Sequence, residues 1–118
     1  MTTGDIHRPT KVAVVGAGNV GATFAYACLL SGLASEIVLI DANRARAEGE
    51  AMDINHAVPL SRPARIWAGD YADTAGAAVT VVTAGSAQRP GESRLDLTAR
   101  NTEIFRSIIP EIARNNPN

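Results

Sequence analysis

Short apolar runs rich in β-branched residues alternate along the chain with longer stretches that have helical periodicity. The short runs predict four strands, at Lys11–Val15, Glu36–Ile40, Ala64–Ala68 and Ala77–Thr83, of which the first two are expected to be buried. The longer stretches predict three helices, at Val20–Leu30, Asn43–Ala57 and Leu95–Asn115. Because proline lacks a backbone N–H, Pro110 is expected to kink or divide the last helix.

This alternation is typical of a parallel sheet that is covered by helices on both faces. We therefore predict an α/β fold with a doubly wound parallel sheet, in which a ligand binds at the carboxyl ends of the strands. Residues 1–10 are polar and are predicted to form a flexible tail, while residues 11–118 form the domain.

The composition narrows the classes of protein to consider. A net charge of -1 without a basic block argues against a nucleic-acid partner. The most apolar stretch, residues 22–34, is shorter than the ~20 residues of a membrane span, so a soluble, cytoplasmic protein without a membrane partner is expected. Cys28, the single cysteine, is predicted to be a small buried side chain, and no metal site is expected.

The sequence VVGAGNVG lies between the first predicted strand and the first predicted helix. Its G-x-G-x-x-G spacing in this position is the pattern of a dinucleotide-binding turn. Gly16 permits the tight turn, Gly18 lets the backbone approach a pyrophosphate, and Gly21 lets the helix and strand pack closely. The N-terminus of the helix then offers N–H groups to the phosphates.

Asp41 follows the second predicted strand at the distance expected for an acid that binds the adenosine ribose. A carboxylate there accepts hydrogen bonds from the ribose hydroxyls and repels a 2′-phosphate, which favours NAD over NADP. Arg44 and Arg46 follow closely and leave NADP open as the alternative.

Five segments together resemble the N-terminal half of the L-lactate/malate dehydrogenase family, especially its bacterial NAD-dependent L-lactate members. They read VAVVGAGNVG, EIVLID, EGEAMDINHA, VVTAGSAQRPGESRLDLTARN and IFRSIIPEI, in this order. The resemblance extends from about Lys11 to Pro117 and implies a Rossmann NAD-binding domain, with NAD as cofactor.

In that family the loop after the fourth strand is a mobile lid over the nicotinamide and the substrate, and its QKPGETRLDL pattern falls on Gln88–Leu97. The match implies that Arg94 polarises the substrate carbonyl. It also implies that Gln88 selects the methyl group of pyruvate, because malate members have arginine there. A loop shifted by one residue would bring Arg89 to that place, so malate remains an alternative.

The resemblance implies further cofactor contacts, at Val20 beside the pyrophosphate, Arg46 beyond the ribose acid, Tyr71 at the adenine pocket, Gly85 and Ser86 near the nicotinamide, and Ser107 on the long helix. For Tyr71 and Ser107, rim packing and an exposed helix hydroxyl are equally open interpretations.

A dehydrogenase of this family also needs a histidine, an aspartate that orients it and a second arginine, which the family places after the region matched here. Neither His7 nor His56 is expected at the strand ends. We therefore expect an N-terminal fragment of an L-lactate dehydrogenase, inactive alone, without its substrate domain, whose full-length parent is a homotetramer acting on pyruvate and lactate. A non-catalytic nucleotide-binding module is the competing hypothesis.

Overall fold

The computed structural model describes residues 10–60, 63–85 and 89–117 of the chain. Ser86, Gln88 and residues 1–9 of the predicted tail lie outside the described residues. In the described part of the chain, no helix combines the length and the apolar character that crossing a membrane requires.

The four predicted strands and three predicted helices are all present and in the predicted order. The strands are β1 (Lys11–Val15), β2 (Glu36–Ile40), β3 (Arg65–Ala68) and β4 (Val79–Val82). The helices are α2 (Asn19–Ser31), α3 (Arg44–Asn55) and α4 (Arg94–Asn115). Two short 3₁₀ helices, η1 (Val58–Leu60) and η2 (Tyr71–Thr74), were not predicted.

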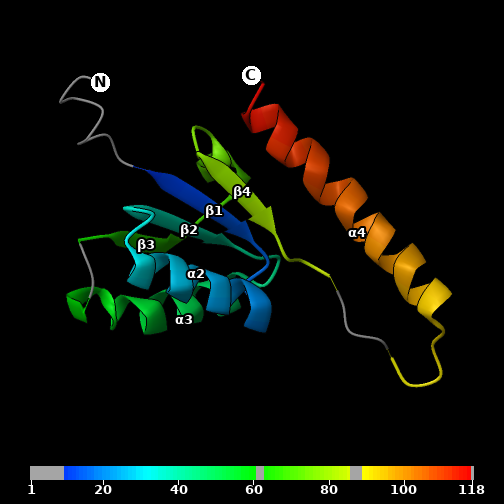
Figure 1. Cartoon of the computed structure of the whole chain (residues 1–118). Helices are drawn as coiled ribbons and strands as arrows, with labels where there is room; N and C mark the ends of the chain where they lie inside the picture. The colour runs from blue at the N-terminus through cyan, green and yellow to red at the C-terminus, as the bar shows by residue number, and fades with distance from the viewer. Residues whose placement is uncertain (1–9, 61–62, 86–88, 118) are drawn as a thin grey trace.

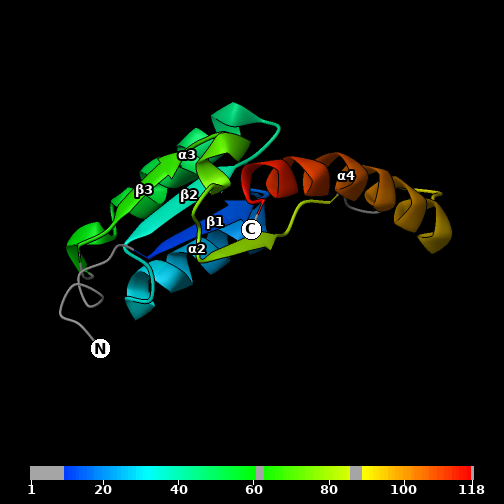
Figure 2. The ribbon, with the colours of Figure 1, turned by 90° about the horizontal axis from the view of Figure 1, so that it is seen from above.

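All strands run parallel, in the order β3-β2-β1-β4. Helices α2 and α3 cover one face of the sheet and α4 lies against the other, as Figures 1 and 2 show from two directions. Strand β2 therefore lies on one side of β1, and β4 lies on the other side of it. The connections that leave β1 and β4 run in opposite directions at this point, which creates the crevice where doubly wound sheets bind ligands. The predicted fold class is confirmed.

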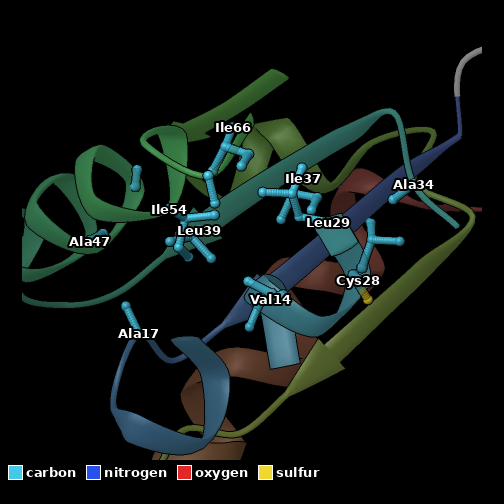
Figure 3. Packing of buried hydrophobic residues seen from close by; sticks show 14 residues of the cluster. Val14, Ala17, Cys28, Leu29, Ala34, Ile37, Leu39, Ala47, Ile54 and Ile66 are labelled. Atoms are coloured by element: carbon cyan, nitrogen blue, oxygen red, sulfur yellow. The ribbon is translucent and has the colours of Figure 1, made fainter. Parts of the chain in front are cut away.

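The side chains of β1 and β2 alternate between two apolar clusters, one on each face of the sheet. Val14, Ile37 and Leu39 pack against α2 and α3, where Leu29 and Ile54 meet them (Figure 3). On the other face, a smaller cluster joins strand residues to α4. Because both faces are covered, the strands carry the continuous apolar runs seen in the sequence.

Cys28 lies in the first of these clusters, as predicted. Burial raises the pKa of its thiol. The thiol therefore stays protonated at neutral pH and acts as a small apolar side chain.

Helix α4 continues as one helix through Pro110, so of the two expected effects of this proline the division was wrong, and the kink stays a prediction. Pro110 is exposed, and the carbonyl of Arg106 that loses its helical partner can be hydrated there. The helix packs on the sheet through Ile104, Ile108 and Ile112. Its N-terminal half projects beyond the sheet (Figures 1 and 2).

Candidate functional site: a cavity at the carboxyl ends of the strands

Two of the three glycines in the G-x-G-x-x-G motif lie where a side chain would clash with neighbouring atoms. Gly16 has a φ of +110°, donates its N–H to the carbonyl of Ile40 at 2.7 Å and accepts a hydrogen bond from Thr83 Oγ1 at 3.0 Å. A Cβ on Gly16 would lie 2.6 Å from the backbone nitrogen of Ala84, and a Cβ on Gly21 would overlap the carbonyl oxygen of Gly16. Both positions therefore exclude every side chain, as predicted from the motif.

Gly18 differs from the other two, because no contact among the described residues requires a glycine there. Its φ of -75° suits any residue, and a Cβ would meet no atom of the described residues within 4 Å. Gly18 is the N-cap of α2 and provides no side-chain cap, so the first N–H groups of the helix are left to other acceptors. Open space beside a helix N-terminus is the arrangement that a phosphate group fits.

Asp41 joins the end of β2 to this turn. Its Oδ2 accepts a hydrogen bond from the N–H of Ala17 at 2.7 Å, and its Oδ1 accepts one from the N–H of Asn43 at 2.8 Å. Each carboxylate oxygen can accept more than one hydrogen bond, so the half-buried group keeps acceptor capacity for a hydroxyl-bearing ligand. The carboxylate therefore shapes the turn and also remains available to bind a ligand.

A cavity of about 380 Å³ lies between these elements. The ends of β1, β2 and β4 form one side of it, and α4 forms the other through Ile104, Ser107 and Ile108. An apolar wall faces a polar edge that consists of the glycine turn, Asp41 and Arg46. This combination suits a ligand with a flat apolar ring, hydroxyl groups and phosphates.

The cavity brings together most of the predicted cofactor residues. Those that line it are Gly16, Gly18, Asp41, Arg46, Tyr71, Gly85 and Ser107. Gly21 is buried beneath the turn. Val20 is 70% exposed and Arg94 is exposed at the start of α4, and neither lines the cavity. Ser86 and Gln88 lie outside the described residues.

Tyr71 and Ser107, for which the sequence left two interpretations open, both line the cavity. Burial raises the pKa of Tyr71, and the nearby carboxylates of Glu111 and Asp41 raise it further, so the phenol stays neutral. The Ser107 hydroxyl donates to the carbonyl of Ile104 at 2.7 Å, which leaves its oxygen free to accept. Both groups can thus offer a hydrogen-bonding atom to a bound ligand.

Sequence reasoning missed Thr83 and the two isoleucines of α4 as parts of this site. The Thr83 hydroxyl connects the end of β4 to the glycine turn, as noted above. The available signal was a hydroxyl residue at the carboxyl end of a predicted strand, the edge of the sheet where a ligand is expected. Ile104 and Ile108 recur at helical spacing in the sequence, but this spacing alone does not separate a cavity wall from a core.

His56 is exposed and forms the C-cap of α3, and it does not line the cavity. Within residues 10–60, 63–85 and 89–117, no group of three or more histidine, cysteine, aspartate or glutamate side chains could hold a metal ion.

Comparison with known proteins gives a consistent result. Residues 10–118 match a family model described as the NAD binding domain of lactate/malate dehydrogenase. An L-lactate dehydrogenase of Clostridium botulinum is 55% identical over 107 residues, which are 91% of this chain and 34% of that protein. An L-lactate dehydrogenase of Acetivibrio thermocellus is 57% identical over 106 residues, which are 90% of this chain and 33% of that protein.

Two solved structures are also similar to the chain in fold and in sequence. A lactate dehydrogenase from a Medee basin deep-sea metagenome library has a TM-score of 0.85 at 44% identity, over 92% of this chain and 35% of that one. A malate dehydrogenase from Archaeoglobus fulgidus, solved in complex with NADH, has a TM-score of 0.84 at 42% identity, over 92% of this chain and 37% of that one. The chain thus spans about a third of the length of these relatives.

Proposed function

Because the chain belongs to the family of lactate/malate dehydrogenase NAD-binding domains, we propose that it is the cofactor-binding part of an NAD-dependent L-lactate dehydrogenase. The reaction is the reversible transfer of a hydride between NADH and pyruvate, which gives L-lactate. The observation that carries the proposal is the cavity at the strand ends, in which the open space at Gly18 and the carboxylate of Asp41 lie along one edge.

NAD is the cofactor of this domain, and the residues present fit it. The backbone at Gly18 and the N-terminus of α2 would hold the pyrophosphate, and Asp41 would accept hydrogen bonds from the adenosine ribose. Tyr71 and Arg46 would lie at the adenine end, with Gly85 and Ser107 toward the nicotinamide. When bound, the nicotinamide supplies or receives the hydride.

The substrate assignment depends on the segment that follows β4. In our proposal Arg94 places its guanidinium against the substrate carbonyl and stabilises the negative charge that develops on the oxygen. Gln88, a neutral amide, would accept the methyl group of pyruvate and would leave the second carboxylate of oxaloacetate unpaired. The two curated relatives described above are L-lactate dehydrogenases, which supports this choice over malate.

The experiment that tests the function is an assay of the complete gene product that contains this sequence, with NADH and either pyruvate or oxaloacetate. We expect a strong preference for pyruvate. A preference for oxaloacetate would mean that Arg89 occupies the selecting position and that the protein is a malate dehydrogenase. The 118-residue chain alone is expected to bind NADH without reducing pyruvate, and turnover by that chain would contradict this expectation.

A second prediction concerns the choice between NADH and NADPH. The chain should bind NADH more tightly, and Asp41→Ala should reduce the ratio of the two affinities by about tenfold or more, because the variant loses both the ribose acceptor and the repulsion of a 2′-phosphate. Fluorescence titration of both nucleotides measures the ratio. Removing the carboxylate also removes the acceptor of the Ala17 and Asn43 N–H groups, so thermal unfolding must be recorded as well.

Glu48→Ala is a matched control for this variant. Glu48 is an exposed carboxylate on α3 that pairs with Arg44 and does not line the cavity. Its removal should leave the affinity ratio unchanged. An unchanged ratio in Asp41→Ala itself would show that another group discriminates between the two nucleotides.

A further inference from the structure

The segment between Arg89 and Asp96 contains several hydrogen bonds between its own residues. The N–H of Glu92 donates to the carbonyl of Arg89 at 3.0 Å, and Gly91 has a φ of +77°, which closes a tight turn on Pro90 and Gly91. Ser93 and Asp96 then form a reciprocal cap at the start of α4. Arg94 follows the cap directly and is the first residue of the helix.

The carboxylate of Glu92 fastens this turn to α4. Its Oε1 accepts hydrogen bonds from the N–H of Arg89 at 3.0 Å and from Arg100 Nη2 at 2.5 Å, and its Oε2 accepts one from Arg100 Nε at 3.1 Å. A guanidinium that binds both oxygens of a carboxylate fixes the orientation of the pair. One carboxylate therefore joins the turn, the helix start and the second turn of α4.

Two properties distinguish this pair from the other ion pairs of α4. The side chains of Arg100 and Glu92 are only 22% and 14% exposed, whereas those of Arg106 and Glu103 are 72% and 70% exposed. Hydrogen bonds from Arg100 and from the N–H of Arg89 also hold the pKa of Glu92 below its ordinary value. The carboxylate is thus ionised at neutral pH, and the pair is lost only as the pH falls through that lowered pKa.

Arg94 has no such restraint on its own side chain. It is exposed, and in the described part of the chain its guanidinium forms no ion pair. The position of the Arg94 guanidinium therefore depends on the position of the backbone at the start of α4. A misplacement of about 1 Å in a catalytic group can cost about 100-fold in rate.

We infer that Glu92 and Arg100 are positioning residues for Arg94: their bidentate pair makes the turn and the first two turns of α4 one unit, which presents the Arg94 guanidinium in a fixed place. The inference rests on the proposed function, in which Arg94 acts on the substrate carbonyl. Sequence reasoning assigned no role to either residue of the pair.

The test is a double-mutant cycle in the complete gene product, with Glu92→Gln and Arg94→Gln made singly and together. Glutamine keeps the volume of Glu92 but loses the ionic bond to Arg100, so kcat for pyruvate reduction should fall about tenfold with NADH affinity unchanged. In the Arg94→Gln background the same change should have almost no effect, because there is no guanidinium left to position.

A merely structural pair would cost the same factor of kcat in both backgrounds, and that result would overturn the inference. Glu103→Gln is the matched control, since it removes an exposed ion pair from the same helix and should leave kcat unchanged. If Glu92→Gln does not fold, as judged by its thermal transition, Arg100→Lys replaces it in the cycle, because it keeps the charge and loses the bidentate contact.

The same experiment separates the two levels of the proposal. If the unaltered protein reduces neither pyruvate nor oxaloacetate, the proposed function fails, and the positioning role fails with it. If the unaltered protein is active and the cycle shows additive losses, only the positioning role fails.

Discussion

A chain that carries Gly21→Ala is expected to lose about 3 kcal/mol of its free energy of unfolding. The new Cβ would overlap the carbonyl oxygen of Gly16 and lie 2.7 Å from Thr83 Oγ1. Neither group can move away cheaply, because Gly16 is bonded to both Ile40 and Thr83, and these bonds join three strands at the edge of the cavity. Urea unfolding of the variant and the unaltered chain measures the difference.

Gly18→Ala is the matched control, since it adds the same methyl group three residues away. Among the described residues, no atom lies within 4 Å of a Cβ at that position and the backbone φ is -75°, so stability should fall by no more than about 1 kcal/mol, because alanine is a poorer N-cap than glycine. NADH affinity should nevertheless fall about tenfold or more, because the methyl group would occupy the space in which we propose that the pyrophosphate binds. Equal stability in both variants would contradict the packing described for the turn.

The sequence was sufficient for those features that depend on local pattern. The bounds predicted for β1 and β2, Lys11–Val15 and Glu36–Ile40, are the observed ones, because each run of β-branched and apolar residues is buried on both faces. Asn43, the first residue of the predicted helix, is the N-cap of α3, which begins at Arg44, and its side chain accepts a hydrogen bond from the N–H of Arg46. The glycine spacing likewise placed the turn at the correct edge of the sheet.

Features that arise from contacts between distant parts of the chain were not predictable in the same way. The hydrogen bond from Thr83 to Gly16 joins residues 67 positions apart. Helix η2 depends on the reciprocal cap between Asp70 and Asp73 and on the burial of Thr74, neither of which repeats with a recognisable period. The sequence also assigned Asp41 to the ribose alone, whereas its carboxylate additionally holds the backbone of the glycine turn.

Helix α4 has some features that the sequence predicts and others that it does not. Its length and its apolar side follow from the sequence, and so does its cap at Ser93 once the S-x-x-D spacing is noticed. Among the described residues of α4, Ile108 alone is buried, and the N-terminal half of the helix projects beyond the sheet. Both features depend on where the chain leaves β4. This placement separates Arg94 from the cofactor cavity in the described structure.

Arg94→Gln in the complete gene product is expected to lower kcat for pyruvate reduction by about 10²–10³-fold, which is the usual loss when one preorganised donor to a developing oxyanion is removed. NADH affinity should not change, because Arg94 is exposed at the start of α4 and does not line the cavity. Steady-state kinetics and a separate NADH titration measure the two effects.

This combination is what distinguishes a group that acts on the substrate from one that holds the cofactor. Arg106→Gln is the matched control, since Arg106 is also an exposed arginine of α4 and pairs only with the exposed Glu103 among the described residues. A similar small loss in both variants would remove Arg94 from the proposed mechanism. A large loss of NADH affinity in Arg94→Gln would instead place its guanidinium against the cofactor, and the carbonyl would then need another donor.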